Sequence, residues 1–253
     1  MPATFTNHHI GKPFIEISSV ESTNNYAMQC IHKGLAQHGY TYFAHEQTAG
    51  KGQRGKQWHA QKEENIIISV VLNTSCLQAS GQFGLSMAVA LATYDFFLQN
   101  ALSDASIKWP NDLYWRDRKA GGILIENIIQ GKEWQWAVAG IGININQPVF
   151  DKAITNPVSL KQITGKNYQP VLLAKELCLH LEQRFLQLVN NGPDQLLTDY
   201  NNVLYKKGER IRLKKDSAVF DCTLKEVNLF GQLVVETSIF QTFNVGEVEW
   251  VIS

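Results

Sequence analysis

The sequence lacks the features that direct a protein to export or to a membrane. Its first residues contain no apolar core of the length that a secretory signal needs. The longest apolar stretch runs from Ile66 to Leu72 and is interrupted by Ser69, so it is far shorter than the roughly 20 residues that span a bilayer. These absences favour a cytoplasmic protein that makes no use of a membrane.

The sequence also lacks net charge and paired cysteines. Lysine and arginine number 23, as do aspartate and glutamate, so no overall field attracts nucleic acid and any anion site must be local. No C-x-x-C pair occurs, which argues against a zinc or disulfide framework and favours reduced, mostly buried thiols. The four cysteines are Cys30, Cys76, Cys178 and Cys222.

Helical and strand patterns are interleaved through the first four fifths of the chain. Apolar residues at three- and four-residue spacing, with capping residues, predict helices over 22–34, 82–100 and 170–191, and a shorter one that ends at 204. Runs of β-prone residues predict strands over 40–46, 65–72, 106–109, 122–129 and 134–143. Because the order is not a regular alternation, we expect an α/β (α+β) fold with a mixed sheet packed with helices.

The pattern of predicted elements changes after about Tyr205, where short strands and turns replace the helices. Strands are expected over 210–214, 220–227, 231–237 and 241–251. Several short strands in under fifty residues are typical of a small β-barrel. We therefore expect two domains, 1–204 and 205–253.

The segment 47–62 combines glycines with basic residues and contains no acid. Its basic residues are Lys51, Arg54, Lys56 and Lys62, and its glycines are Gly50, Gly52 and Gly55. Glycines let backbone N–H groups approach a ligand while the cations supply charge, a combination suited to phosphate or carboxylate oxygens. A solvated surface loop is the alternative.

The same segment almost matches a phosphate-binding P-loop. Gly50, Gly55 and Lys56 fit the G-x-x-x-x-G-K pattern. Gln57 stands where a hydroxyl would hold magnesium, and the strand predicted over 65–72 follows instead of a helix. We therefore reject the P-loop interpretation.

Two further segments carry polar groups at strand ends. In 108–112, Lys-Trp-Pro-Asn-Asp, the proline ends a strand and the last residues favour a turn. Lys119 precedes two glycines and a strand, where its charge can be aimed from a rigid element. Glu126 on the same run could be a buried partner or could lie on the outer face.

Residues 140–146, Gly-Ile-Gly-Ile-Asn-Ile-Asn, end another predicted strand. The start of this segment resembles a dinucleotide fingerprint but lacks the third glycine and the helix. Period-two spacing puts Asn144 and Asn146 on one face, where they could bind a ligand or the next turn.

In this order, these segments resemble the catalytic core of the biotin-protein ligases. The matching segments are 21–24, 47–58, 108–113, 119–126 and 140–146, and residues 231–233 and 243–248 resemble the C-terminal SH3-like domain of that family. The resemblance implies a catalytic domain of the class II aminoacyl-tRNA synthetase-like fold over 1–204, and an SH3-like barrel over 205–253. It also implies an enzyme that makes biotinyl-5′-adenylate from biotin and ATP, and transfers biotin to a lysine of the biotin carboxyl carrier domain of a carboxylase.

The resemblance also assigns site residues. Lys119 and Arg54 are the expected catalytic residues. The expected biotin contacts are Ser22, Thr23, Asn24, Gln47, Lys51, Gly52, Gln53 and Lys119. The expected ATP and adenylate contacts are Gly50, Arg54, Lys56, Trp58, Lys108, Asn111, Asp112 and Asn144, with Asp112 as a ligand of Mg²⁺.

The glycine and cation segment departs from the all-arginine form common in the family. Lys51 and Gln53 stand where arginines are often found. Glutamine carries no charge and cannot make the bidentate contact of a guanidinium, so we expect the adenylate to depend on Arg54 or to be held less tightly.

Two other functions stay open at this point. Lipoate-protein ligases share the fold and the adenylation chemistry, but they lack Lys-Trp-Pro-Asn-Asp and the loop that ends in Trp58. An RNA-binding module would explain the basic residues over 206–215, although acids interrupt them and no aromatic ladder accompanies them. Because the chain begins almost at the catalytic core, we expect no winged DNA-binding domain and no DNA partner. Monomer and homodimer are both compatible with the sequence.

Overall fold

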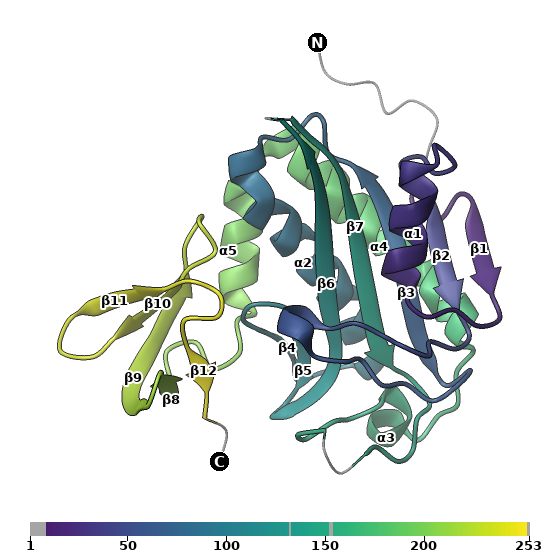
Figure 1. Cartoon of the computed structure of the whole chain (residues 1–253). Helices are drawn as coiled ribbons and strands as arrows, with labels where there is room; N and C mark the ends of the chain where they lie inside the picture. Colours follow the sequence, from purple (N-terminus) through teal and green to yellow (C-terminus); the bar gives the residue numbers. More distant parts are fainter. Residues whose placement is uncertain (1–8, 132, 152–153, 252–253) are drawn as a thin grey trace.

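A seven-stranded mixed sheet forms the centre of the computed structural model, which describes residues 9–131, 133–151 and 154–251 (Figure 1). The strands lie in the order β1-β2-β3-β7-β6-β5-β4. Their bounds are β1 (Phe14–Ile17), β2 (Thr41–Ala44), β3 (Asn65–Asn73), β4 (Ala105–Lys108), β5 (Asp112–Trp115), β6 (Arg118–Gln130) and β7 (Glu133–Asn144). β1 and β2 run parallel and the other neighbours are antiparallel, which confirms the predicted mixed sheet.

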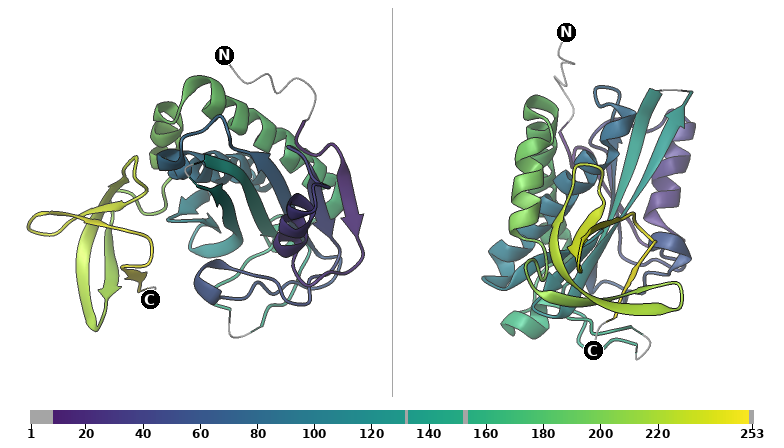
Figure 2. Two further views of the ribbon diagram at one scale, coloured as in Figure 1. Left: turned by 45° about the horizontal axis from the view of Figure 1, so that its top comes forward. Right: turned by 90° about the vertical axis from the view of Figure 1, so that its left-hand side faces the viewer.

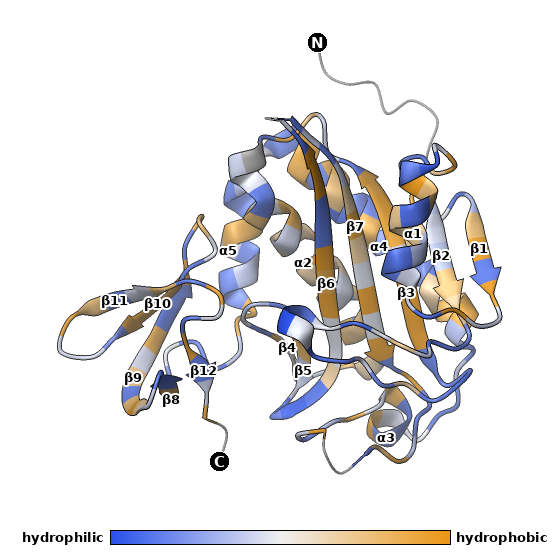
Figure 3. Cartoon of the chain, viewed as in Figure 1, coloured by the Kyte–Doolittle hydropathy of each residue, from blue (hydrophilic) through white to orange (hydrophobic). Residues whose placement is uncertain are grey.

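Strand β3 shows why some strands could be read from the sequence. Residues 65–72 are all buried because helices contact both faces of the strand, and such a strand reads as a continuous apolar run. Figure 3 shows this concentration of apolar residues along β3 and β6. β1 and β5 were not predicted because each has only four residues, too few to reveal a period.

Helices cover both faces of the sheet (Figure 2). α2 (Gln82–Ala101) and α4 (Pro170–Asn191) pack on one face, α5 (Asp194–Asn202) lies beside them, and α1 (Thr23–His32) covers the other face. The bounds of α4 are those predicted, since Pro170 begins the helix and Gly192 ends it with a φ of 77°. The short α3 (Leu160–Thr164), which begins at a capping box on Ser159, was not predicted. No helix in the described part of the chain is long and apolar enough to cross a membrane.

The C-terminal region forms a second sheet of five antiparallel strands in the order β11-β10-β9-β8-β12. Its strands are β8 (Arg210–Lys215), β9 (Ala218–Val227), β10 (Leu233–Glu236), β11 (Phe240–Phe243) and β12 (Glu249–Trp250). The run 241–251, predicted as one strand, is two strands because the Glu247 carboxylate accepts from the Asn244 N–H at 2.9 Å and closes a turn. β11 and β12 do not pair with each other in the described residues, so the predicted closed barrel is corrected to an open sheet.

Side chains of the main domain hold this second sheet in place. The indole Nε1 of Trp109 donates to the carbonyl of Gly231 at 2.9 Å, and both groups are buried. The Asn201 amide forms two hydrogen bonds of 2.8 Å with the backbone of Val227. A side chain on Gly231 would meet the Phe83 ring at 2.7 Å, so the backbone of the second sheet packs directly on α2.

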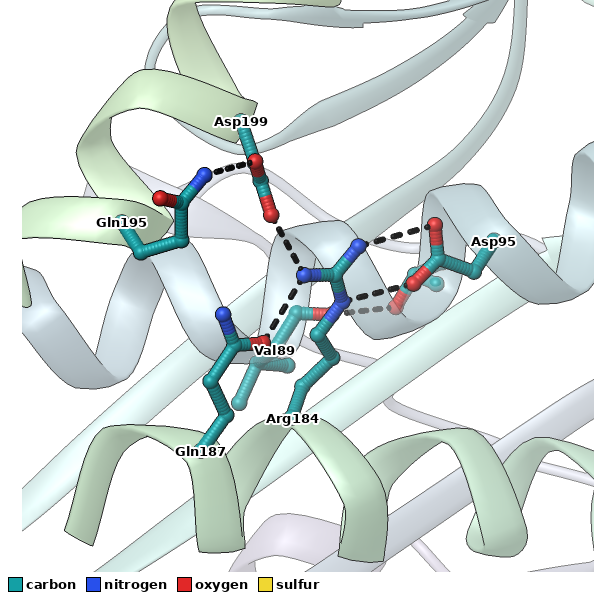
Figure 4. A network of polar contacts seen from close by, with 7 residues as sticks. Val89, Asp95, Arg184, Gln187, Gln195 and Asp199 are labelled. Carbon is teal, nitrogen blue, oxygen red and sulfur yellow. Dashed lines mark hydrogen bonds and ion pairs between the residues drawn. The ribbon is translucent and has the colours of Figure 1, made fainter. Parts of the chain in front are cut away.

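Arg184 joins the three helices that lie behind the main sheet (Figure 4). From α4, its guanidinium contacts Asp95 of α2 at 2.7 Å and Asp199 of α5 at 2.7 Å, and it donates to Gln187 at 2.9 Å. The Arg184 side chain is 18% exposed, so water screens these contacts only partly. The two carboxylates share a single cation.

We expect Arg184→Ala to lower the free energy of unfolding by about 2–4 kcal/mol, because it leaves two partly buried carboxylates without their cation. Urea unfolding followed by circular dichroism measures this change. Arg210→Ala is the matched control, since Arg210 is 77% exposed and such pairs are worth about 0–1 kcal/mol. Equal losses in the two variants would show that the network does not hold the helices together.

Candidate active site

A cavity of about 1120 Å³ opens at the N-terminus of α1 and extends to the second sheet. It collects most of the residues that the sequence assigned to a site. Those that line it are Ser22, Thr23, Asn24, Gln47, Lys51, Gly52, Gln53, Arg54, Lys56, Trp58, Lys108, Asn111, Asp112 and Lys119.

Two predicted site residues lie outside this lining. Gly50 lines a neighbouring cavity of about 260 Å³ on the other side of Trp58. The buried amide of Asn144 donates to the carbonyl of Val158 at 3.1 Å, and Asn146 exchanges two hydrogen bonds with the backbone of Tyr168. Asn144 also donates to the Lys119 carbonyl at 3.4 Å, so it joins the backbone of Lys119 to the chain that follows β7, and Asn146 holds that chain as well.

The N-terminus of α1 supplies neutral polar groups to one end of the cavity. Ser22 caps the helix by accepting from the Asn25 N–H at 3.4 Å. The Gln47 Oε1 accepts from the Thr23 N–H at 2.7 Å and lies 3.0 Å from the Thr23 hydroxyl, so the loop before Gly50 is joined to the helix end. This end of the cavity therefore carries hydroxyl and amide groups, with no charged side chain in these contacts.

Trp58 lies flat on glycines of the central strands. Gly122 on β6 and Gly142 on β7 are cross-strand neighbours. A side chain on Gly142 would meet the Trp58 ring at 2.4 Å, and one on Gly122 would meet it at 3.4 Å. Gly122 and Gly142 thus make room for an indole. The Trp58 Nε1 is buried and has no hydrogen-bond partner among the described residues.

Contacts of Lys51 and Arg54 hold the segment 50–58 at the cavity. The Lys51 Nζ donates to the side-chain oxygen of Asn25 at 2.6 Å. Arg54 adopts a φ of 55°, and its guanidinium lies against Gly246 of the second sheet, where an added Cβ would be 2.9 Å from its Cζ. The chain then continues into β3, as expected from the failed P-loop match.

Lys119 and Asp112 form an ion pair inside the cavity. Their Nζ and Oδ1 atoms are 2.6 Å apart, and the side chains are 29% and 24% exposed. The Lys119 ammonium lies 6.0 Å from the centroid of the Trp58 ring. Asn111 donates to the Ile123 carbonyl at 2.6 Å, which holds the Lys-Trp-Pro-Asn-Asp turn against β6.

Lys108 is the most enclosed cation of the site. Its Nζ is 3.0 Å from the Tyr114 hydroxyl and lies 4.8 Å and 5.1 Å from the ring centroids of Tyr114 and Trp250. Burial lowers the pKa of Lys108 to about 8. Trp250 was not predicted as a site residue, because a single tryptophan in a two-residue strand belongs to no pattern.

Three of the basic residues at the start of the second sheet are paired with acids. Lys206 lies 3.5 Å from Asp117, and Arg210 and Arg212 lie 3.3 Å and 3.1 Å from Asp221. Contact with these guanidinium groups lowers the pKa of Asp221. These pairs partly neutralise the basic surface, which does not favour an RNA groove.

Comparison with known proteins identifies a family. A model of the biotin/lipoate A/B protein ligase family matches residues 16–144. The bifunctional ligase/repressor BirA of Escherichia coli is 30% identical over 170 residues, which cover 64% of this chain and 51% of that protein. The biotin--[acetyl-CoA-carboxylase] ligase of Mycobacterium tuberculosis is 29% identical over 201 residues, which cover 78% of this chain and 73% of that protein.

The fold is shared with a solved structure. The biotin protein ligase of Aquifex aeolicus, in complex with biotin and ATP, superposes with a TM-score of 0.80 at 21% identity. The superposition covers 94% of this chain and 98% of that protein. Because the family model matches more than half of this chain, the chain belongs to the biotin/lipoate A/B protein ligase family.

Proposed function

We propose that the protein is an ATP-dependent biotin-protein ligase. It joins biotin to ATP as biotinyl-5′-adenylate with release of pyrophosphate, and it then transfers biotin to a lysine of the biotin carboxyl carrier domain of a carboxylase. The observation that carries the proposal is one cavity of about 1120 Å³ with a neutral polar end and a cationic end. Since sites for one drug-sized ligand usually span about 300–1,000 Å³, this volume suits two substrates together.

The neutral end suits the ring of biotin. A cyclic urea has two N–H donors and one carbonyl acceptor and carries no charge. Hydroxyl and amide groups such as those of Ser22, Thr23 and Gln47 match these groups without the cost of dehydrating an ion.

The cationic end suits the reaction of a carboxylate with a triphosphate. Two unit charges roughly 4 Å apart interact by about 1 kcal/mol in water and about 4 kcal/mol at an effective dielectric near 20, so a partly dehydrated site needs cations. Lys119 and Arg54 are the proposed catalytic residues, which cancel this repulsion and stabilise charge on the transferred phosphoryl group. Lys108 and Lys56 add to the field at the same end.

Asp112 is the proposed contact for Mg²⁺. Its carboxylate lines the cavity, and magnesium usually takes one or two carboxylates together with phosphate oxygens and water. No group of three or more His, Cys, Asp or Glu side chains that could hold a metal occurs in the part of the chain described. This donor set fits an ion that arrives with the nucleotide, whose charge would add to that of Lys119.

The relatives support biotin over lipoate. The curated relatives in Escherichia coli and Mycobacterium tuberculosis carry ligase names, the second with biotin, and the Aquifex aeolicus structure contains biotin and ATP. We further propose the division into a catalytic domain, 1–204, and an SH3-like domain, 205–253. We also propose that the enzyme is cytoplasmic, that it is a monomer or a homodimer, and that it does not bind DNA. Equal numbers of basic and acidic residues support the last point, because they create no overall field that attracts nucleic acid.

The test is pyrophosphate release from ATP with biotin or lipoate, followed by transfer to a purified biotin carboxyl carrier domain. We expect release with biotin and a mass increase on the carrier lysine. Release with lipoate alone would instead identify a lipoate ligase, and release with neither acid would contradict the proposal.

We expect Lys119→Ala to slow adenylate formation at least about 100-fold, because an electrostatic contact to the reacting phosphoryl group is lost. Single-turnover measurement of biotinyl-adenylate checks this. Lys62→Ala is the control, since Lys62 is 56% exposed and lies outside the cavity lining. Near-normal rates in the folded Lys119→Ala variant would show that the catalytic assignment is wrong.

We expect Gln53→Arg to slow the escape of the adenylate by about tenfold, because a guanidinium adds charge-assisted hydrogen bonds to an anion. Dissociation of labelled adenylate from the enzyme measures this rate. Gln78→Arg is the control: it makes the same substitution at an exposed position elsewhere in the chain and should leave the dissociation rate unchanged. An unaltered rate in Gln53→Arg would remove this position from the retaining contacts.

A further inference from the structure

The buried amide of Asn24 spans the sheet face between β3 and β6. Asn24 is 3% exposed. Its Nδ2 donates to the Glu126 Oε2 at 2.8 Å and to the Leu124 carbonyl at 3.2 Å. Its Oδ1 accepts from the Ser69 hydroxyl at 2.6 Å. Both amide hydrogens of Asn24 therefore have protein acceptors.

The register of three strands makes this arrangement possible. Ser69 on β3, Gly140 on β7 and Leu124 on β6 lie directly opposite one another. A side chain on Gly140 would place its Cβ 2.3 Å from the Asn24 Oδ1. The glycine thus lets the amide lie on the backbone of β7, with Ser69 on one side and Glu126 on the other.

Glu126 and the Leu124 carbonyl together determine which way the Asn24 amide faces. An ionised carboxylate and a backbone carbonyl are acceptors only, whereas a hydroxyl can donate or accept. If the Asn24 amide were rotated by 180°, its oxygen would face the Glu126 carboxylate and the Leu124 carbonyl. Acceptor oxygens would then face each other in both contacts, with no hydrogen between them. The Ser69 hydroxyl would tolerate either orientation. The two acceptors on β6 therefore set the preferred orientation of the Asn24 amide, and the charge of Glu126 strengthens this preference.

We propose that Glu126 is a positioning residue that holds the Asn24 oxygen as an acceptor at the cavity, so that the site selects an acid whose ring carries N–H donors. Asn24 and Gly140 line the cavity, whereas Glu126 stands behind Asn24 and is not among the described lining residues. A carbonyl oxygen has two lone pairs, and Ser69 uses one of them. In the proposed arrangement, the second accepts from a ring N–H of the substrate.

This inference rests on the proposed function and adds a reason for its selectivity. The ureido ring of biotin offers N–H donors, and the dithiolane ring of lipoate offers none. A buried acceptor that loses its donor is costly, so a site built around hydrogen bonds rejects the ligand that lacks them. Glu126 thereby contributes to substrate choice without contacting the substrate.

The test compares two substitutions of similar length. Glu126→Gln keeps a side-chain oxygen that can accept from Asn24, and Glu126→Met removes it. We expect the Kd of biotin, measured by calorimetry without ATP, to rise about tenfold or more in Glu126→Met and by less than about threefold in Glu126→Gln. The Kd of ATP should stay within twofold in both variants.

Lipoate provides the readout that a merely structural role would not produce. We expect kcat/KM for lipoate-dependent pyrophosphate release to be unchanged in Glu126→Met, so that the preference for biotin falls about tenfold. Glu133→Ala, an exposed glutamate on the adjoining strand, is the control and should change neither substrate. Glu126→Ala replaces the methionine variant if thermal unfolding shows that the latter does not fold.

A biotin Kd within twofold of wild type in Glu126→Met, or an equal loss for biotin and lipoate, would overturn the inference. These outcomes leave the proposed function standing when the wild-type protein still forms the adenylate. A wild-type protein that neither binds biotin nor releases pyrophosphate would overturn the proposed function and this inference with it.

Discussion

The close approach of side chains to glycine backbone at the centre of the sheet is the constraint on which the site depends. The Trp58 indole lies on Gly142, and the Asn24 amide lies on Gly140, at distances that no side chain on those glycines would permit. Because the glycines are two residues apart on β7, both groups lie on the same face of one rigid strand. The glycines of β7 therefore make room for two side chains that line the cavity, and further polar groups come from α1 and the loops.

The second sheet completes the cationic end of the cavity. The Lys108 ammonium lies over the Trp250 ring, and the guanidinium of Arg54 packs against Gly246. The hydrogen bond from Trp109 to Gly231 fixes this sheet to the turn that carries Lys108. A chain with no net charge thus brings cations together by folding, and the partial burial of Lys119 strengthens its electrostatic interactions relative to an open surface.

Periodicity and turn residues were enough to predict most of the fold, because long buried elements leave a repeated pattern. The helix over 170–191 and the strand that begins at Asn65 have the expected bounds. Short elements such as β1, β5 and α3 were missed, since four or five residues cannot display a period. The barrel expected at the C-terminus is an open sheet in the described residues, because strand number alone does not determine which edges pair.

The sequence by itself determined the chemistry available, namely the glycine and cation segment, the Lys-Trp-Pro-Asn-Asp turn and Lys119, and it placed them in the order of a known family. Only the tertiary structure decided which of these groups meet. It directed Asn144 toward Val158, and it brought Glu126 of β6 to Asn24 of α1 and Trp250 to Lys108. These contacts depend on strand register and on packing between distant segments, which local patterns do not encode.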